Sequence, residues 1–361
     1  MKNMKNSKFK ILLLVVLIGG FGLLQNCGSD DDGGSAPPVV TIDKTVLQAA
    51  ITTATTLLSD TTEGTAVGNY TVGSKTILQD AINLAQAIVD NASSTQAQVN
   101  AAVVSLNSAI DTYNAAIVEE IAPENLAGHW KFDGGTGTTV SDSSGNGFTG
   151  TFGSASADLA GADGTSVPVW TADRFGTANK ALFFDKGAKV TIPYSGAINP
   201  QEITISVWIR IDEQRNNRFI GLQSWHGYKF EVQDANFPFF TANYTSGLYD
   251  KASVNNIAVD TNWYHLVVTY GGGEMSFYIN GVLTNTEPSL DGALRTVSGH
   301  DLVFGVDSSQ YDSVTTNYVD FTSVIPGAWG SYLHGALDEV RIYNTVLTAP
   351  QVTALNNAEK P

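Results

Sequence analysis

The chain has 361 residues, of which 43% are hydrophobic and 15% are charged, and its formal net charge is −16. This apolar content with few charges excludes an intrinsically disordered chain, and the length allows two or three domains that each bury a core. The acidic surplus opposes contact with polyanions, so we expect no nucleic acid among the partners, whereas neutral sugars and divalent cations remain compatible.

Residues 1–26 have the pattern of a secretory signal peptide. Four lysines within the first ten residues precede the apolar run Ile11–Leu24, which is shorter than a membrane-spanning helix requires. Cys27, the only cysteine of the sequence, follows this run and resembles the lipid-attachment residue of bacterial lipoproteins. The acidic residues 30–32 resemble the signal that sends Bacteroidetes lipoproteins to the cell surface. We therefore expect a lipid anchor in the outer membrane and a tether over residues 27–38; a free thiol in a soluble N-terminus is the alternative.

Residues 39–120 carry the 3.6-residue periodicity of three amphipathic helices. Asp43, Ser74 and Thr95 stand where capping residues are expected. Behind them, apolar residues recur every three or four positions: Leu47, Ile51, Ala54 and Leu58; Leu78, Ile82, Ala85 and Val89; Val99, Val103, Leu106, Ile110 and Tyr113. This pattern predicts an up-down-up bundle with these stripes as its core. The stretch 73–116 also resembles the FIVAR-type helical modules of bacterial surface proteins, which implies a spacer.

From residue 124 to the C-terminus the hydrophobic period changes to two. Ile203–Ile211 alternates isoleucine or valine with polar residues and tryptophan, as a strand does. Asn280 and Gly281 lie between two apolar runs and are a strong signal for a two-residue hairpin turn. Ten or more strands without long intervening helices predict an all-β sandwich of two sheets. A short terminal helix is expected to open at Thr348.

Several sequence blocks in this region resemble, in the same order, those of laminin-G-like domains of the concanavalin A-like superfamily. The blocks are GHWKFD (128–133), DSSGNG (142–147), ALFFD (181–185), WYHLVVTY (263–270), YING (278–281) and GALDEVRIYN (335–344). The resemblance implies a jelly-roll β-sandwich over residues 124–361. The predicted fold class is therefore multidomain, with a small all-α three-helix bundle followed by an all-β concanavalin A-like jelly roll. Function stays open, because this fold carries lectins, adhesins and glycosidases.

Known catalytic motifs do not occur in the sequence. The retaining glucanases of this superfamily carry Glu-x-Asp-x-x-Glu on one strand; the nearest pair here, Glu231 and Asp234, has a different spacing and points to opposite faces of a strand. The five histidines are dispersed and form no zinc-binding motif. We expect no enzymatic activity, and leave open a carboxylate pair contributed by distant strands.

Members of the superfamily often hold one calcium ion where the first and last strands meet. The resemblance assigns Asp338 as the matching ligand, with Asp133 and Asn146 as helpers, and hard oxygen ligands suit Ca²⁺. A structural calcium ion is one expectation. In the alternative, Asp338 bonds to the backbone or pairs with Arg341.

Sugar recognition needs aromatic rings for the apolar face of a pyranose, and amides or carboxylates for its hydroxyl groups. Trp130, Trp208 and Trp263 lie in strand patterns and are expected in the core. The predicted stacking residues lie in rim loops: Trp225, Tyr228, Tyr244 and Trp329. The predicted hydroxyl partners are Gln223, His226, Asn243 and Asp307. In the alternative, these aromatic residues close the core beneath long loops.

These features predict a non-catalytic, cell-surface glycan-binding lipoprotein that captures an oligo- or polysaccharide beside outer-membrane transporter components. One alternative is a structural or assembly subunit of an outer-membrane protein complex, in which the same rim binds a protein. The other is a glycoside hydrolase with atypical carboxylates.

Overall fold

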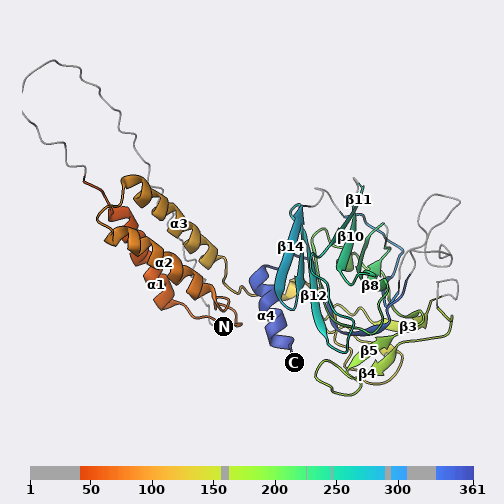
Figure 1. Cartoon of the computed structure of the whole chain (residues 1–361). Coiled ribbons are helices and arrows are strands. Elements are labelled where there is room, and N and C mark those ends of the chain that lie inside the picture. The colour runs from red at the N-terminus through yellow and green to blue at the C-terminus, as the bar shows by residue number, and fades with distance from the viewer. Residues whose placement is uncertain (1–40, 156–161, 225, 245–246, 289–293, 307–330) are drawn as a thin grey trace, which may run out of the picture. The chain divides into compact units, whose positions relative to one another are not determined.

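The computed structural model describes residues 41–155, 162–224, 226–244, 247–288, 294–306 and 331–361. Helices occupy the first part of this chain, and strands fill most of the rest (Figure 1). The predicted order of a helical module followed by a two-sheet sandwich is confirmed.

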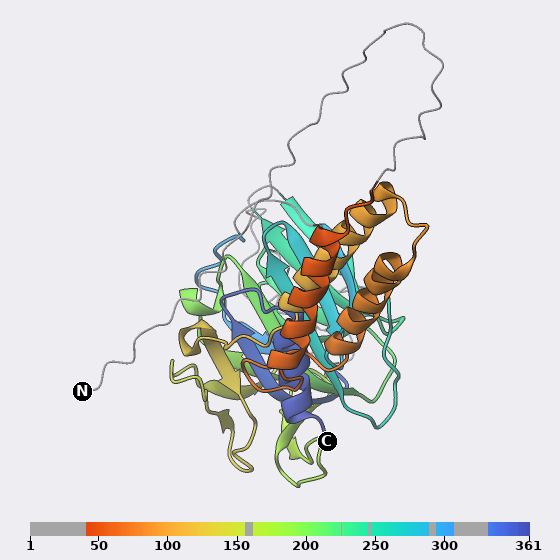
Figure 2. The same cartoon turned by 90° about the vertical axis from the view of Figure 1, so that its left-hand side faces the viewer.

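The helical module consists of α1 (Thr45–Asp60), α2 (Ser74–Asp90) and α3 (Gln96–Asn114), which run side by side in both views (Figures 1 and 2). Its core contains the predicted leucines at positions 47, 78 and 106, all buried. Thr95 caps α3: its hydroxyl accepts a hydrogen bond from the Gln98 backbone N–H, and the Gln98 side chain accepts one from the Thr95 N–H. Both ends of this capping box satisfy amides that a helix start leaves open.

The start of α2 differs from the prediction. Gly73 is the N-cap, with a φ of +96°, and Ser74 is the first helical residue instead of the cap. The Ser74 hydroxyl donates to the Glu63 carboxylate at 3.3 Å. A left-handed backbone at the N-cap favours glycine, so the chain turns into α2 through backbone freedom rather than through a capping side chain.

Among the described residues, sixteen strands form two eight-stranded antiparallel sheets. In the first sheet the order is β14-β13-β12-β7-β16-β5-β4, and β1 also pairs with β16. Its strands are β1 (Leu126–Trp130), β4 (Val169–Thr171), β5 (Ala181–Phe184), β7 (Ile203–Ile211), β12 (Tyr264–Gly271), β13 (Glu274–Ile279), β14 (Val282–Pro288) and β16 (Gly335–Tyr343).

In the second sheet the order is β11-β10-β9-β8-β15-β6-β3-β2. Its strands are β2 (Thr139–Val140), β3 (Gly150–Ser154), β6 (Ala188–Ile192), β8 (Asn217–Leu222), β9 (Tyr228–Val232), β10 (Pro238–Tyr244), β11 (Gly247–Ala252) and β15 (Leu302–Phe304). Two short 3₁₀ turns, η1 (Pro123–Asn125) and η2 (Gly196–Ile198), join these elements.

One continuous hydrophobic core takes residues from both sheets. The apolar residues of β7 that were predicted to share a face are all buried in it, as are Phe230 of β9 and Phe304 of β15. Trp130 lies in this core, packs edge-on against Phe304 with 5.1 Å between ring centroids, and donates its indole N–H to the Phe148 carbonyl at 2.7 Å. The indole thereby buries its apolar area without leaving its one donor unpaired.

The two strongest local signals of the sequence are confirmed. Asn280 and Gly281 join β13 to β14 with φ values of +52° and +77°, as a type I′ hairpin turn requires. Thr348 caps α4 (Ala349–Glu359) through a second capping box with Gln351. None of the helices in the described part of the chain combines the length and apolar character needed to cross a membrane. Residues Asp43–Pro361 form one compact unit.

Candidate functional site

Strands β8 to β11 carry polar side chains on the side of the second sheet that faces away from the core, and most of these side chains are themselves buried. Tyr228 and Phe230 of β9 belong to the core, so the alternating residues Lys229 and Glu231 point to the other side. Cross-strand pairing places Arg218 next to Glu231, and Lys229 next to Thr241, which in turn pairs with Asp250. We call this set the polar face: Arg218, Lys229, Glu231, Thr241, Asn243 and Asp250.

Glu231 is the centre of the polar face. One carboxylate oxygen lies 2.7 Å from the Arg218 Nε, and the other lies 3.4 Å from the Lys229 Nζ. All three side chains are at most 4% exposed. The Thr241 hydroxyl donates to the Asp250 carboxylate at 2.6 Å. Arg218 and Lys229 therefore share one carboxylate, and both oxygens of Glu231 are engaged.

The charged groups of the polar face shift one another's pKa values because they are buried. The pKa of Lys229 is lowered to about 8, because burial and the neighbouring Arg218 lower it by more than Glu231 and Asp250 raise it. Burial also lowers the pKa of Arg218, and Glu231 again opposes this. Since an unpaired charge is expensive at low solvent exposure, Glu231 has a structural role in keeping both cations in place.

Three of the predicted hydroxyl partners lie together at one end of the polar face. Gln223 directly follows β8 and has a φ of +47°, and its side-chain oxygen accepts a hydrogen bond from the His226 backbone N–H at 2.8 Å. The backbone N–H of Asn243, on β10, donates to the carbonyl of Gly227 at 2.8 Å. His226 is half-buried, whereas Gln223 and Asn243 are buried. We call Gln223, His226 and Asn243 the amide corner.

Two predicted stacking residues are placed differently, and the prediction for them is wrong. Tyr228 is fully buried, and its hydroxyl donates to the Ile198 carbonyl at 2.7 Å; burial raises its pKa far above the usual range. Tyr244 is also fully buried, edge-on to Tyr270 at 5.1 Å between centroids. Both rings lie on the core side of strands β9 and β10, so neither can stack on a ligand. Trp225, Asp307 and Trp329 lie outside the described residues.

The predicted calcium ligands each have a different protein partner. Asp338 forms an ion pair with Arg174, and not with Arg341 as the alternative had it. Asp133 lies 3.4 Å from the Lys180 Nζ, and the Asn146 side-chain N–H donates to the carbonyls of Leu126 and Ala127. Within the described ranges, no three histidine, cysteine or acidic side chains are arranged to hold a metal ion. This donor set does not fit a calcium ion, and calcium binding by the chain stays a prediction.

A second buried charged cluster joins β1, β16 and α4. Glu339 adopts a φ of +50° at a bulge of β16, so its carboxylate turns toward His129 at 2.6 Å and Arg341 at 2.7 Å. Arg341 also contacts Glu359 of α4 at 2.5 Å, and the Trp208 indole donates to the same carboxylate at 3.0 Å. Bulges often re-aim side chains in this way. The cluster fixes the last turn of α4 on the sheet.

His265 lies beneath the same helix and is fully buried. Its Nε2 lies 2.8 Å from the Ser206 hydroxyl, and its ring stacks on Trp208 with 5.1 Å between centroids. Burial lowers the pKa of His265 to about 3, helped by the positive charges of Arg341 and Arg174. The serine–histidine pair belongs to the packing of the domain beneath α4.

Comparison with known proteins identifies both parts of the chain. Residues 184–353 match the laminin-G-like profile of the concanavalin A-like lectin/glucanases superfamily, and residues 43–114 match the FIVAR domain. The chain joins a FIVAR domain to a concanavalin A-like domain. Both predicted resemblances are thereby confirmed.

Individual relatives match the chain in part. The surface-layer 125 kDa protein of Lysinibacillus sphaericus is 38% identical over 158 residues; this covers 41% of the present chain and 13% of that protein. Domain 4 of AbnA, an extracellular arabinanase from Geobacillus stearothermophilus solved with arabinotriose, has a TM-score of 0.47 at 21% identity, over 64% of this chain and 98% of that one. The binding domain of Paraclostridial Mosquitocidal Protein 1 has a TM-score of 0.45 at 16% identity, over 65% and 52%.

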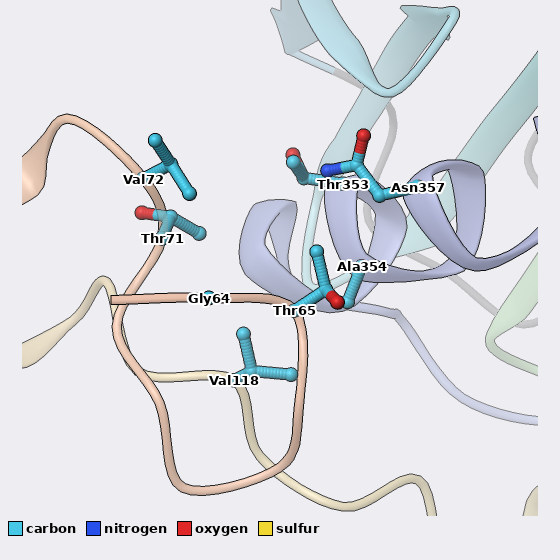
Figure 3. A pocket seen from close by; sticks show the side chains of 8 residues that line it. All are labelled: Gly64, Thr65, Thr71, Val72, Val118, Thr353, Ala354 and Asn357. Atoms are coloured by element: carbon cyan, nitrogen blue, oxygen red, sulfur yellow. The ribbon is translucent and has the colours of Figure 1, made fainter. Parts of the chain in front are cut away.

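A separate pocket has a volume of about 180 Å³ and shares no lining residue with the polar face (Figure 3). It is lined by Gly64, Thr65, Thr71, Val72, Val118, Thr353, Ala354 and Asn357. These residues supply hydroxyls and one amide but no acid or base, so the pocket offers no group for proton transfer. The polar face and the amide corner of the concanavalin A-like domain remain the better candidate site.

Proposed function

We propose that the chain is a cell-surface protein whose concanavalin A-like domain binds a carbohydrate, without cleaving it. The proposed site is the accessible rim of the polar face and the amide corner, where Asp250 is exposed and His226 is half-buried. The observation that carries this proposal is the gathering of charged, hydroxyl and amide groups on the non-core side of β8–β11. Sugar hydroxyls are recognised by such groups, which both donate and accept hydrogen bonds. The membership of a lectin and glucanase superfamily is consistent with this ligand class.

The geometry of Glu231 supports binding over hydrolysis. A glycosidase needs one carboxyl group that gives or takes a proton at the scissile bond, and a second carboxylate across from it. Both oxygens of Glu231 are held by cations. Asp234, the second carboxylate of the pair considered for hydrolysis, is exposed beyond the end of β9. Neither residue is placed to share one sugar ring with the other.

The cell-surface location rests on the N-terminal sequence and on the relative. We propose that Cys27 carries a lipid that anchors the protein in the outer membrane, with the FIVAR domain as spacer and transporter components beside it. The surface-layer relative is a surface protein by its name, which supports an extracellular location. Cys27→Ser should release the protein from the membrane fraction; retention of this variant would contradict the anchor.

Affinity electrophoresis in gels that contain neutral or acidic polysaccharides tests the binding proposal, with a soluble form that spans residues 41–361. The wild type should be retarded by at least one polysaccharide, and Asn243→Ala should weaken that retardation tenfold or more. Asn107→Ala, an exposed asparagine of α3, is the matched control and should behave as wild type. Equal retardation of Asn243→Ala and wild type would overturn the proposed site. Release of reducing sugar that Glu231→Gln abolishes would favour the hydrolase alternative.

One observation favours protein binding as a second candidate function. The matched relative is named a surface-layer protein, and its name does not mention a carbohydrate. In that case a partner protein would occupy the polar face, and native co-purification would recover it from wild type but not from Asn243→Ala.

A further inference from the structure

An exposed apolar seam runs along helices α2 and α3 of the FIVAR domain. Two shallow pockets of about 290 and 380 Å³ follow each other along it, from Val72 and Ala116 at one end to Ile88 and Gln98 at the other. No charged residue lines either pocket. We call this surface the α2/α3 seam.

The two helices contribute unequal side chains to the seam. From α2 come large apolar residues, among which Ile77 is 62% exposed and Leu84 is 73% exposed. From α3 come the small residues Ala101, Ala102, Ser105 and Ala109. The other α3 residues of the lining are Gln98, Thr112 and the buried Leu106 and Tyr113. The larger exposed side chains of α2 thus form a ridge beside the smaller residues of α3, which we call the floor. Contiguous exposed apolar surface of this kind marks interaction sites.

The seam is self-complementary, which indicates a second copy of this chain as its occupant. A two-fold axis parallel to the helices places α2 of one copy on α3 of the other, so that each ridge lies on the partner's floor, and the same patch serves both copies. Small residues allow helices to approach closely. We propose that two copies of the chain associate through their α2/α3 seams.

Charge and area are consistent with this pairing. Without the four lysines of the signal, the chain has 15 basic and 35 acidic residues, so most faces of two copies repel each other. The three FIVAR helices carry five charged residues, none of which lines the seam: Asp60, Lys75, Asp80, Asp90 and Asp111. A face about 25 Å long and two helices wide buries on the order of 1,000 Å² in total, the lower end for a specific interface. The expected association is therefore weak, with a dissociation constant of roughly 10–500 µM.

Sedimentation equilibrium of residues 41–361 between about 5 and 500 µM tests the pairing. The wild type should move from monomer to dimer, and Leu84→Glu should raise the dissociation constant at least tenfold, because it buries two carboxylates in an apolar contact. Val46→Glu, on an exposed position of α1 outside the seam, is the control and should dimerise as wild type. Circular dichroism confirms that both variants fold. A monomer at every concentration, or a dimer that Leu84→Glu leaves unchanged, would overturn the proposal.

Cysteine cross-linking tests the arrangement itself, since residues 41–361 contain no cysteine. Leu84 and Ala102 line the same pocket, so the proposed axis brings Leu84 of one copy onto Ala102 of the other. A mixture of Leu84→Cys and Ala102→Cys chains should form disulfide-linked dimers faster than either variant alone. Faster cross-linking of Leu84→Cys with itself would instead place α2 on α2 and contradict the ridge-on-floor pairing.

Discussion

Replacing Glu231 by glutamine should destabilise the concanavalin A-like domain more than any surface charge change. The side chain is buried, and its two oxygens hold Arg218 at 2.7 Å and Lys229 at 3.4 Å. Removal of one partner from a buried ion pair costs about 3–5 kcal/mol, because the remaining charge stays buried. For a domain of this size, each kcal/mol lowers the melting temperature by about 2–4 °C, so Glu231→Gln should melt about 6–20 °C below wild type.

Differential scanning calorimetry at pH 7, supported by urea unfolding followed by tryptophan fluorescence, measures this effect. Glu287→Gln is the matched control, because Glu287 of β14 pairs with Lys251 of β11 at 3.0 Å and both side chains are partly exposed. Its melting temperature should equal that of wild type within the error of the measurement. A variant in which Arg218, Lys229 and Glu231 are all replaced by methionine or leucine should recover most of the lost stability. If Glu231→Gln unfolds within about 1 kcal/mol of wild type, the structural role assigned to this carboxylate is refuted.

Three further outcomes follow from the geometry. Acidification from pH 7 to pH 5 should lower the free energy of unfolding by about 2 kcal/mol through His265, because the unfolded histidine takes up a proton near pH 6.5 while the folded one, with a pKa of about 3, does not. His265→Gln should lack this part of the pH dependence. If urea unfolding gives the same pH profile for this variant and the wild type, the role of His265 is refuted. Gly305→Ala should destabilise the protein by about 1–3 kcal/mol more than Gly299→Ala. Both glycines have a φ of +90°, but only at Gly305 would the new methyl group overlap with the Phe184 ring, at 2.3 Å. Equal melting temperatures of the two variants would contradict this overlap. Tyr228→Phe should lower the free energy of unfolding by about 1 kcal/mol, because the hydrogen bond to the Ile198 carbonyl is lost, and should leave any glycan affinity unchanged. Weaker retardation of this variant in affinity gels would contradict the buried position of the ring.

The parts of the fold that the sequence predicted well are those set by neighbouring residues. The capping boxes at Thr95 and Thr348 and the turn at Asn280 and Gly281 each depend on side chains or glycines within a few positions of one another. The alternation over Ile203–Ile211 is equally local, because one strand shows it whatever its neighbours are. Such signals survive folding because tertiary contacts reinforce them.

The candidate site was harder to predict because the face of each strand that points toward the core decides which of its residues reach the site. Residues 236–249 contain asparagines, a proline and aromatic residues, which resemble a rim loop, yet the structure places strands β10 and β11 there. In a strand, Tyr244 and Asn243 point to opposite faces, so the amide of this pair lies at the site and the ring lies in the core. Applying the same parity to Tyr228 and Lys229 could have located the polar face.

Other features join residues that are distant in the sequence. The ion pair of Arg174 with Asp338 spans 164 positions, and that of His129 with Glu339 spans 210. The bulge that turns Glu339 toward His129 leaves no mark in the sequence, because glutamate is not a residue that favours a positive φ. The cationic partner of Asp338, which was predicted as a calcium ligand, could not be identified from the sequence for the same reason: Arg174 comes from a distant part of the chain.

The most direct test of carbohydrate binding at the polar face is an NMR titration of residues 41–361. The probe is the oligosaccharide bound most strongly on a glycan array, added to ¹⁵N-labelled protein. The backbone signals of residues 223–231 and 241–250 should shift in proportion to the bound fraction, while those of α1–α3 stay in place. Shifts confined to the helices or to the first sheet, or none at saturating sugar, would contradict the proposed site.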